Sequence, residues 1–213
     1  MVTRKKYSLS EQVYRDIKEL IVYGKIKPGE LLTVGEMAER FNVSKTPVRD
    51  AFNELKHNGL LEVLPYKGYF VSKVNLQDLN ELFTLRILLE GGAGELAAQN
   101  ATKEDIEKLE ELARVQFRPD DEESEIVFMK TNFNFHITLA EASNNRRLVK
   151  LIENNLDQMQ RVLYLDLKIA NPYAMSEEHT ALVKLIKERN AEGVKKMLVS
   201  HIEASRNRVA KKL

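Results

Sequence analysis

The sequence contains no cysteine, few aromatic residues and no long apolar run, and each of these absences excludes a class of protein. Without Cys among its 213 residues, the chain has neither disulfides nor thiolate metal sites, which is compatible with a reducing cytoplasm. The N-terminal MVTRKKYSLSEQ lacks the apolar core of a signal peptide, and no later segment approaches the roughly 18 apolar residues of a membrane span. We therefore expect a cytoplasmic protein with no membrane partner.

The net charge of +1 hides an asymmetry between two parts of the chain. Residues 1–73 contain 13 Lys and Arg against 9 Asp and Glu, a net +4, whereas residues 74–213 contain 20 against 23, a net −3. Hydrophobic residues make up 43% of the chain and aromatic residues only 7%, a composition that suits helical cores of Leu, Ile, Val and Ala. The length and the charge division predict two domains, 1–73 and 74–213.

Residues 32–71 have the pattern of two short helices, a tight turn and a two-stranded wing. Thr33 and Glu36 form the sequence signature of a capping box, in which hydroxyl and carboxylate satisfy each other's backbone donors at a helix start. Ser44 is placed to cap a second helix, which we expect to end near Asn58-Gly59. The pattern predicts a helix-turn-helix with this second helix as the recognition helix.

The predicted recognition helix has one apolar and one polar face. Its apolar residues at helical spacing are Val48, Phe52 and Leu55, and its opposite face carries Lys45, Thr46, Arg49 and Asn53. At its N-terminus, Ser44, Lys45 and Thr46 offer free backbone amides and the positive end of the helix dipole to a phosphate. The planar fork of Arg49 matches the two acceptors of a guanine edge. The stripe therefore predicts entry into a DNA major groove.

The wing is predicted from two short strands, 61–64 and 69–73, joined across 65–68 with Lys67 and Tyr66 at the tip. A basic exposed stripe also occurs on small three-helix domains that bind no DNA, so the pattern alone leaves that alternative open.

Residues 8–73 resemble the winged-helix domain of the GntR family of bacterial transcription regulators. The resemblance is carried by Leu20-Ile21 with Gly24, by Pro28-Gly29-Glu30, by VSKTPVRDAFNELKHNGLLE and by Gly68. It implies that Lys45, Thr46 and Arg49 contact operator DNA and that Lys67 and Gly68 lie on the wing. Lys45 stands where Arg is commoner, and Gly35 where some members place a basic residue, so the resemblance does not imply an operator sequence.

The second part of the chain has six helical stretches separated by short punctuation. They cover about 75–99, 103–115, 122–141, 146–169, 173–189 and the segment that follows 190–193 and reaches the C-terminal lysines. The short connections predict an all-α antiparallel six-helix bundle.

Three of the four histidines lie in this predicted bundle. His179 and His201 each lie 11 residues from Asn190, so in a helical hairpin both would stand roughly 16 Å from the turn. Asn132 and His136 are four residues apart, on one helix face. Three imidazoles and an amide oxygen would form a divalent transition-metal site, although each His taken singly also suits an ordinary helix residue. His57, at the end of the recognition helix, is expected on the surface and is no candidate ligand.

The same residues carry a second resemblance, to the ligand-binding FCD domain of the FadR subfamily of these regulators. The matching segments are TLRILLE with Arg86 and Glu90, FHITLAEASNN after Asn132, EEH at 177–179, and His201. In that subfamily, three His and an acidic residue four before the first His bind a metal, and small organic acids bind at or beside it. The resemblance implies His136, His179 and His201 as ligands of zinc or nickel, with Asn132 at the acidic position.

The amide at that position is a departure from the family pattern, because a neutral oxygen is a weaker ligand than a carboxylate and leaves more positive charge on the metal. Six helices rather than seven place the domain with the VanR-like branch. Arg86, within an apolar segment, is a candidate for pairing with a carboxylate effector, and the alternative is an intrahelical pair with Glu90. Arg161 is a weaker effector candidate.

These observations predict a homodimeric repressor that binds a near-palindromic operator and is controlled by a small carboxylate at a metal site. One alternative is a metal-dependent hydrolase-like enzyme, with Glu177 or Glu178 as base, but the chain has no HExxH pattern. Another is a DNA-binding protein whose helical domain only dimerises.

Overall fold

A computed structural model of the chain describes residues 8–65 and 68–212. The chain divides into two compact units, Met1–Val74 and Asn75–Leu213, and a separate hydrophobic core lies in each. The first unit is a winged helix-turn-helix and the second is all helical, which confirms the predicted mainly α fold. Within the described residues, no helix is long and apolar enough to cross a membrane.

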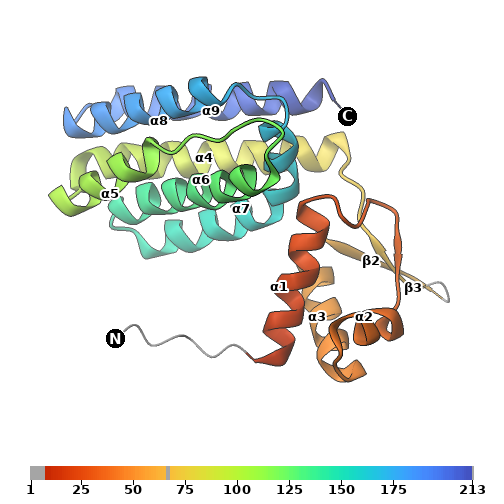
Figure 1. The fold of residues 1–213 in the computed structure, drawn as a ribbon. Coiled ribbons are helices and arrows are strands. Elements are labelled where there is room, and N and C mark those ends of the chain that lie inside the picture. The colour runs from red at the N-terminus through yellow and green to blue at the C-terminus, as the bar shows by residue number, and fades with distance from the viewer. Residues whose placement is uncertain (1–7, 66–67, 213) are drawn as a thin grey trace. The chain divides into compact units, whose positions relative to one another are not determined.

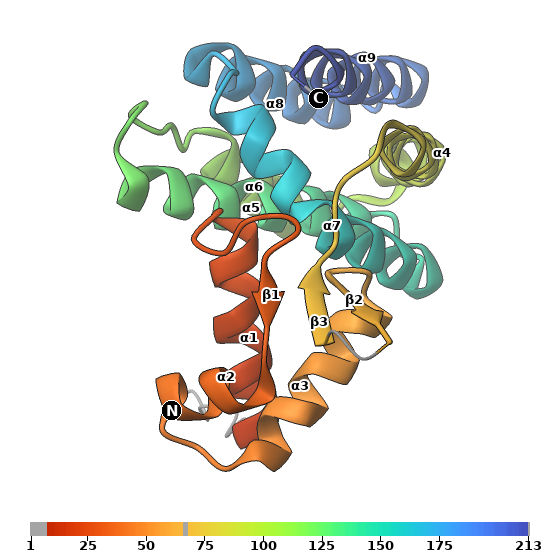
Figure 2. The ribbon, with the colours of Figure 1, turned by 90° about the vertical axis from the view of Figure 1, so that its right-hand side faces the viewer.

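The first unit packs three helices against a small sheet (Figure 2). The helices are α1 (Leu9–Val22), α2 (Val34–Phe41) and α3 (Lys45–His57), and the strands are β1 (Leu31–Leu32), β2 (Leu61–Leu64) and β3 (Gly68–Val71). All pairings are antiparallel, in the order β1-β3-β2. The sequence predicted only the β2–β3 hairpin, because a two-residue strand such as β1 is too short to show alternation. The second predicted strand, 69–73, ends two residues beyond β3.

The turn between α2 and α3 is formed by Asn42, whose left-handed conformation (φ 52°) ends α2. Asn is one of the few residues besides Gly that adopts this conformation readily. At the start of α2, the Thr33 hydroxyl accepts from the backbone N–H of Glu36, but the Glu36 carboxylate accepts from that hydroxyl and not from the Thr33 backbone. The predicted reciprocal capping box is therefore only half formed.

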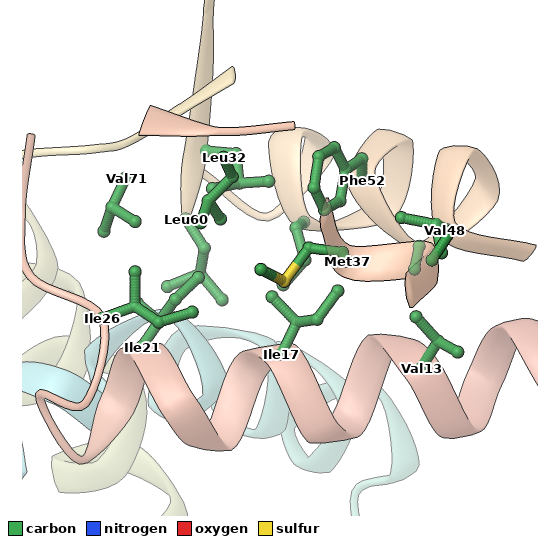
Figure 3. Close-up of a cluster of buried hydrophobic side chains, with 14 residues drawn as sticks. Val13, Ile17, Ile21, Ile26, Leu32, Met37, Val48, Phe52, Leu60 and Val71 are labelled. Atoms are coloured by element: carbon green, nitrogen blue, oxygen red, sulfur yellow. The ribbon is translucent and has the colours of Figure 1, made fainter. Parts of the chain in front are cut away.

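The core of the first unit lies between α1, α3 and the sheet (Figure 3). Ile17 from α1, Met37 from α2 and Phe52 from α3 point toward one another in this core. Phe52 is completely buried and meets the Tyr69 ring edge-on, with 4.7 Å between the ring centroids. This packing holds the apolar face of α3 inward, so that its opposite face is free.

The second unit consists, in the part of the chain that the structure describes, of the six predicted helices (Figure 1). They are α4 (Leu76–Asn100), α5 (Lys103–Ala113), α6 (Glu122–Ala142), α7 (Arg146–Leu167), α8 (Pro172–Lys187) and α9 (Ala191–Ala210). Side-chain caps at Asn75, Thr102, Asp121 and Asn145 fix four of the starts. The last helix begins earlier than predicted, because the Asn190 side chain accepts from the N–H of Gly193 and caps it.

Helix α4 packs closely against α9, and Figure 2 shows α4 end-on with α9 beside it. Gly94 makes the close approach possible: a Cβ there would lie 2.3 Å from Cδ1 of Leu198 and 2.9 Å from Cγ1 of Val194. Both neighbours are fully buried and have little room to move.

We expect Gly94→Ala to lower the free energy of unfolding by about 1–3 kcal/mol, because the added methyl overpacks the α4–α9 contact. Gly92→Ala, two residues earlier on the same helix, is the matched control, since its Cβ would have nothing within 4 Å. That control should be neutral or up to about 1 kcal/mol more stable, because Ala is the better helix former. Urea unfolding of both variants measures the difference, and equal effects would contradict the packing argument.

Candidate functional site

The exposed face of α3 is the first candidate site. Val48, Phe52 and Leu55 are completely buried, while Lys45, Thr46, Arg49 and Asn53 are all exposed, as the sequence predicted. Ser44 is the N-cap residue by position, but its side chain makes no cap hydrogen bond, so the predicted side-chain cap is wrong. The hydroxyl of Ser44 and the first amides of α3 are consequently available to another molecule.

The wing contributes Gly68, which starts β3 with φ 113°, a conformation that favours Gly. A Cβ at this position would lie 3.2 Å from Cδ1 of Leu31. Gly68 pairs with Leu64 of β2, and its lack of a Cβ leaves room for the Leu31 side chain of β1. Lys67 and Tyr66, predicted at the tip of the wing, lie outside the described residues.

The second candidate site is a cluster of three buried imidazoles in the helical unit. His136 comes from α6, His179 from α8 and His201 from α9, and their side chains are no more than 5% exposed. One ring nitrogen of each lies within 4.8 Å of the others. The helical hairpin of α8 and α9 thus brings together the two histidines that flank Asn190, as their spacing predicted.

Carboxylates orient two of these imidazoles from behind. Nδ1 of His136 lies 2.6 Å from Oε2 of Glu90 on α4, and Nδ1 of His201 lies 2.5 Å from Oε2 of Glu178 on α8. Each Nδ1 therefore lies beside a carboxylate, an arrangement that favours the tautomer with the proton on Nδ1 and the lone pair on Nε2. A carboxylate behind a histidine in this way is the usual second partner of a metal ligand.

Three buried polar atoms at the cluster have no hydrogen-bond partner among the described residues: Oε2 of Glu90, Nε2 of His179 and Oδ1 of Asn132. All three side chains are at least nine-tenths buried, and a buried polar atom without a partner is costly. Lone pairs on three imidazoles and one amide oxygen form a donor set that fits a divalent transition metal. The residues present therefore fit the metal implied by the sequence.

Arg86 of α4 reaches into the same cluster. Its Nε donates to Oε1 of Glu90 at 2.5 Å, so the intrahelical pair considered from the sequence is formed. Its Nη2 lies 2.9 Å from Nε2 of His136. Arg86 is 2% exposed, which makes this a buried triad of Arg86, Glu90 and His136.

Burial and charge shift the pKa values of this triad away from the ordinary ones. Burial alone raises the pKa of Glu90, but Arg86 and His136 outweigh it and lower the value to about 2. Burial lowers the pKa of His136 to about 4, against the opposing charge of Glu90. Burial likewise lowers the pKa of His179 well below its usual range. At neutral pH the triad therefore holds a carboxylate, and His136 and His179 are neutral, the form that binds a metal.

A small cavity adjoins the cluster, with a volume of about 10 Å³, enough for about one water molecule. Its lining includes Arg86, Asn132 and His201 together with Asp166 and Ser205. Arg161, the weaker effector candidate, is not among the lining residues; it lies on α7, partly buried.

Asp166 and Ser205 were not predicted as site residues. Asp166 accepts two hydrogen bonds from Arg208, at 2.7 and 2.9 Å, and Oγ of Ser205 is without a partner in the described part of the chain. Neither residue belongs to a motif. A single sequence carries no signal that α7 and α9 pack side by side, so it could not predict that Asp166 and Ser205 line the same cavity.

Comparison with known proteins follows the same division of the chain. Residues 9–71 match the family model "Bacterial regulatory proteins, gntR family", and residues 81–204 match the FCD domain. The HTH-type transcriptional regulator YdhC of Bacillus subtilis is 31% identical over 89% of this chain and 86% of its own length. The HTH-type transcriptional repressor RspR of Escherichia coli is 26% identical over 92% of this chain and 86% of its own length.

Solved structures agree in fold. McbR/YncC of Escherichia coli superposes with a TM-score of 0.77 at 26% identity, covering 97% of this chain and 99% of that one. A regulator from Rhodococcus also has a TM-score of 0.77, at 20% identity, and at that level the likeness concerns the fold alone. The matched families and relatives are transcription regulators and not enzymes, which removes the hydrolase alternative.

Proposed function

Because the chain belongs to the GntR family of bacterial transcription regulators and carries an FCD domain, we propose that it is a homodimeric, metal-containing repressor released by a small organic acid. The observation that carries the proposal is the convergence of three buried imidazoles, two of them backed by carboxylates. Such a regulator acts in the cytoplasm, where its operator is.

In this proposal, the exposed face of α3 reads the operator. Arg49 pairs with a base edge in the major groove, while Ser44, Lys45 and Thr46 hold the phosphate backbone at the helix N-terminus. Lys67 and Gly68, which the sequence places in the wing, are proposed as further DNA contacts. The exposure of Ser44, Lys45, Thr46 and Arg49 supports this assignment.

The metal site is proposed to consist of His136, His179 and His201, with Asn132 as a weaker oxygen ligand. A bound zinc or nickel ion would supply a positive charge, and open positions on it, for an anion. Glu90 and Glu178 hold two of the imidazoles in the required tautomer.

The acid is proposed to bind beside this site, with Arg86 as the partner of its carboxylate. The cavity of about 10 Å³ is too small for an organic acid as it stands, so side chains must move to admit one. Met129 and Met175 line it, and methionine changes rotamer at little cost. Arg161 does not line this cavity, which makes its proposed role in effector binding the weaker of the two.

A homodimer is proposed because a near-palindromic operator requires two α3 helices. In support, Leu85 and Leu88 on α4 are 45% and 68% exposed, and Leu151 on α7 is 52% exposed. Helices α4 and α7 pack together, and large exposed apolar side chains on neighbouring helices are typical of an interface. The two DNA-binding units of such a dimer can be arranged in a way that fits the operator or in a way that does not. An acid that binds one arrangement more tightly than the other would change operator affinity by about 1–3 kcal/mol.

The test is a titration of operator DNA, selected by the protein from a random duplex library, against a panel of carboxylates with and without zinc. We expect at least one acid to weaken operator binding by about 5- to 150-fold, and only in the zinc-loaded protein. No response to any acid, together with no zinc uptake, would favour a helical domain that only dimerises.

Two variants test, in the same titration, whether α3 binds the operator. Arg49→Ala should weaken operator binding by about 1–3 kcal/mol and leave zinc uptake intact. Lys27→Ala, which removes an exposed charge outside α3, should change operator binding much less. Equal losses in both variants would argue against α3 as the reading helix.

A further inference from the structure

The guanidinium of Arg86 divides its hydrogen bonds between a carboxylate and an imidazole. Nε donates to Glu90 at 2.5 Å, and Nη2 lies 2.9 Å from Nε2 of His136 and 3.5 Å from its Nδ1. Arg86 and His136 are 2% and 0% exposed. Water does not compete for these contacts, so the guanidinium is held on Nε2.

Nε2 is also the atom through which His136 would bind a metal, because Nδ1 is directed at Glu90. A single lone pair cannot accept from an N–H and bind a metal at once. Two cations held at the same imidazole nitrogen in a buried site would also repel each other strongly. The contact between Nη2 and Nε2 is therefore incompatible with metal bound through His136.

We infer that Arg86 is an internal substitute for the metal, which caps Nε2 of His136 in the metal-free protein and leaves it on metal loading. This inference rests on the proposed metal site. While Nη2 leaves, Nε can keep its bond to Glu90, because the two groups lie on one helix four residues apart. Arg86 then neutralises Glu90 in both states, and only its outer nitrogen changes partner.

The consequence concerns the acid. Arg86 lines the cavity, and an Nη2 withdrawn from His136 is a buried donor that needs an acceptor. A carboxylate supplies one. Metal and acid therefore strengthen each other's binding, as linkage requires, and Arg86 prevents the metal-free protein from responding to the acid.

The test compares zinc affinities of full-length wild type, Arg86→Met and Arg86→Gln by competition with a chromophoric chelator, with and without acetate as the probe anion. Both variants should bind zinc about tenfold more tightly than wild type, because no charge-assisted hydrogen bond has to be broken first. Acetate should raise the zinc affinity of wild type more than that of either variant.

Arg147→Met is the matched control, since it removes an exposed arginine from the same unit outside the cavity lining, and its zinc affinity should equal that of wild type. If Arg86→Met does not fold, the zinc affinity of Arg86→Gln is compared with that of wild type instead. Zinc affinity that is equal to or below wild type in the variants overturns the role of Arg86 and leaves the metal site standing. Absence of zinc binding in every protein overturns both.

Discussion

Replacing His179 by Ala is expected to lower zinc affinity at least about 100-fold, more than the 10- to 100-fold loss typical of disturbing the partner of a metal ligand. His179 is the most informative of the three ligands to remove. Its Nε2 has no hydrogen-bond partner in the described residues, whereas removing His136 or His201 would also remove a contact with a carboxylate, that of Glu90 or Glu178. The substitution chiefly removes the stack on Phe135, which has 4.0 Å between ring centroids. Chelator competition measures the affinity, and circular dichroism checks that the fold is kept.

His57→Ala is the control for this experiment. His57 is exposed at the end of α3, in the other unit, and its removal should leave zinc affinity unchanged. Full zinc affinity in His179→Ala would show that the metal does not use the imidazole cluster as proposed.

The second large effect is expected from Phe52→Ala, which should lower the stability of the winged-helix unit by about 3–5 kcal/mol. Phe52 is completely buried in the core shared by α1, α3 and the sheet, and the loss is large against a typical total of about 5–15 kcal/mol. Operator binding should fall with the fraction folded. Zinc binding should persist, because the helical unit has a separate core. Urea unfolding followed by circular dichroism, alongside a zinc titration, measures the two effects.

Val63→Ala on β2 is the matched control, since Val63 is 43% exposed and surface substitutions usually change stability by no more than about 0.5 kcal/mol. A parallel fall of zinc affinity and operator binding in Phe52→Ala would contradict the independence of the two cores.

Much of this fold could be predicted from local sequence signals. The bounds of α3 and the positions of the six later helices followed from caps and breakers such as Asn75, Asn145 and Asn190, because these residues act within one turn of the backbone. The pairing of His179 with His201 followed from hairpin symmetry. The DNA and effector contacts of individual residues stay predictions.

What the sequence did not predict depends on tertiary packing. The strand β1 consists of two residues and forms only through its pairing with β3. The Glu36 carboxylate accepts a hydrogen bond from the Thr33 hydroxyl and not from the Thr33 backbone, although the capping signature is present. The position of Arg86 on Nε2 of His136 depends on how α4 and α6 pack, and spacing along one helix carries no information about that.

For the proposed repressor released by an acid, the cavity of about 10 Å³ affects the concentration of acid at which the protein would respond. A pocket that must open before it admits its acid binds with an apparent affinity reduced by the fraction of molecules that are open. The dose of acid that releases the operator is then set by the ease of opening as well as by the contacts that the acid makes. Substitutions at Met129 or Met175 offer a route to retune that dose without altering which acid is recognised.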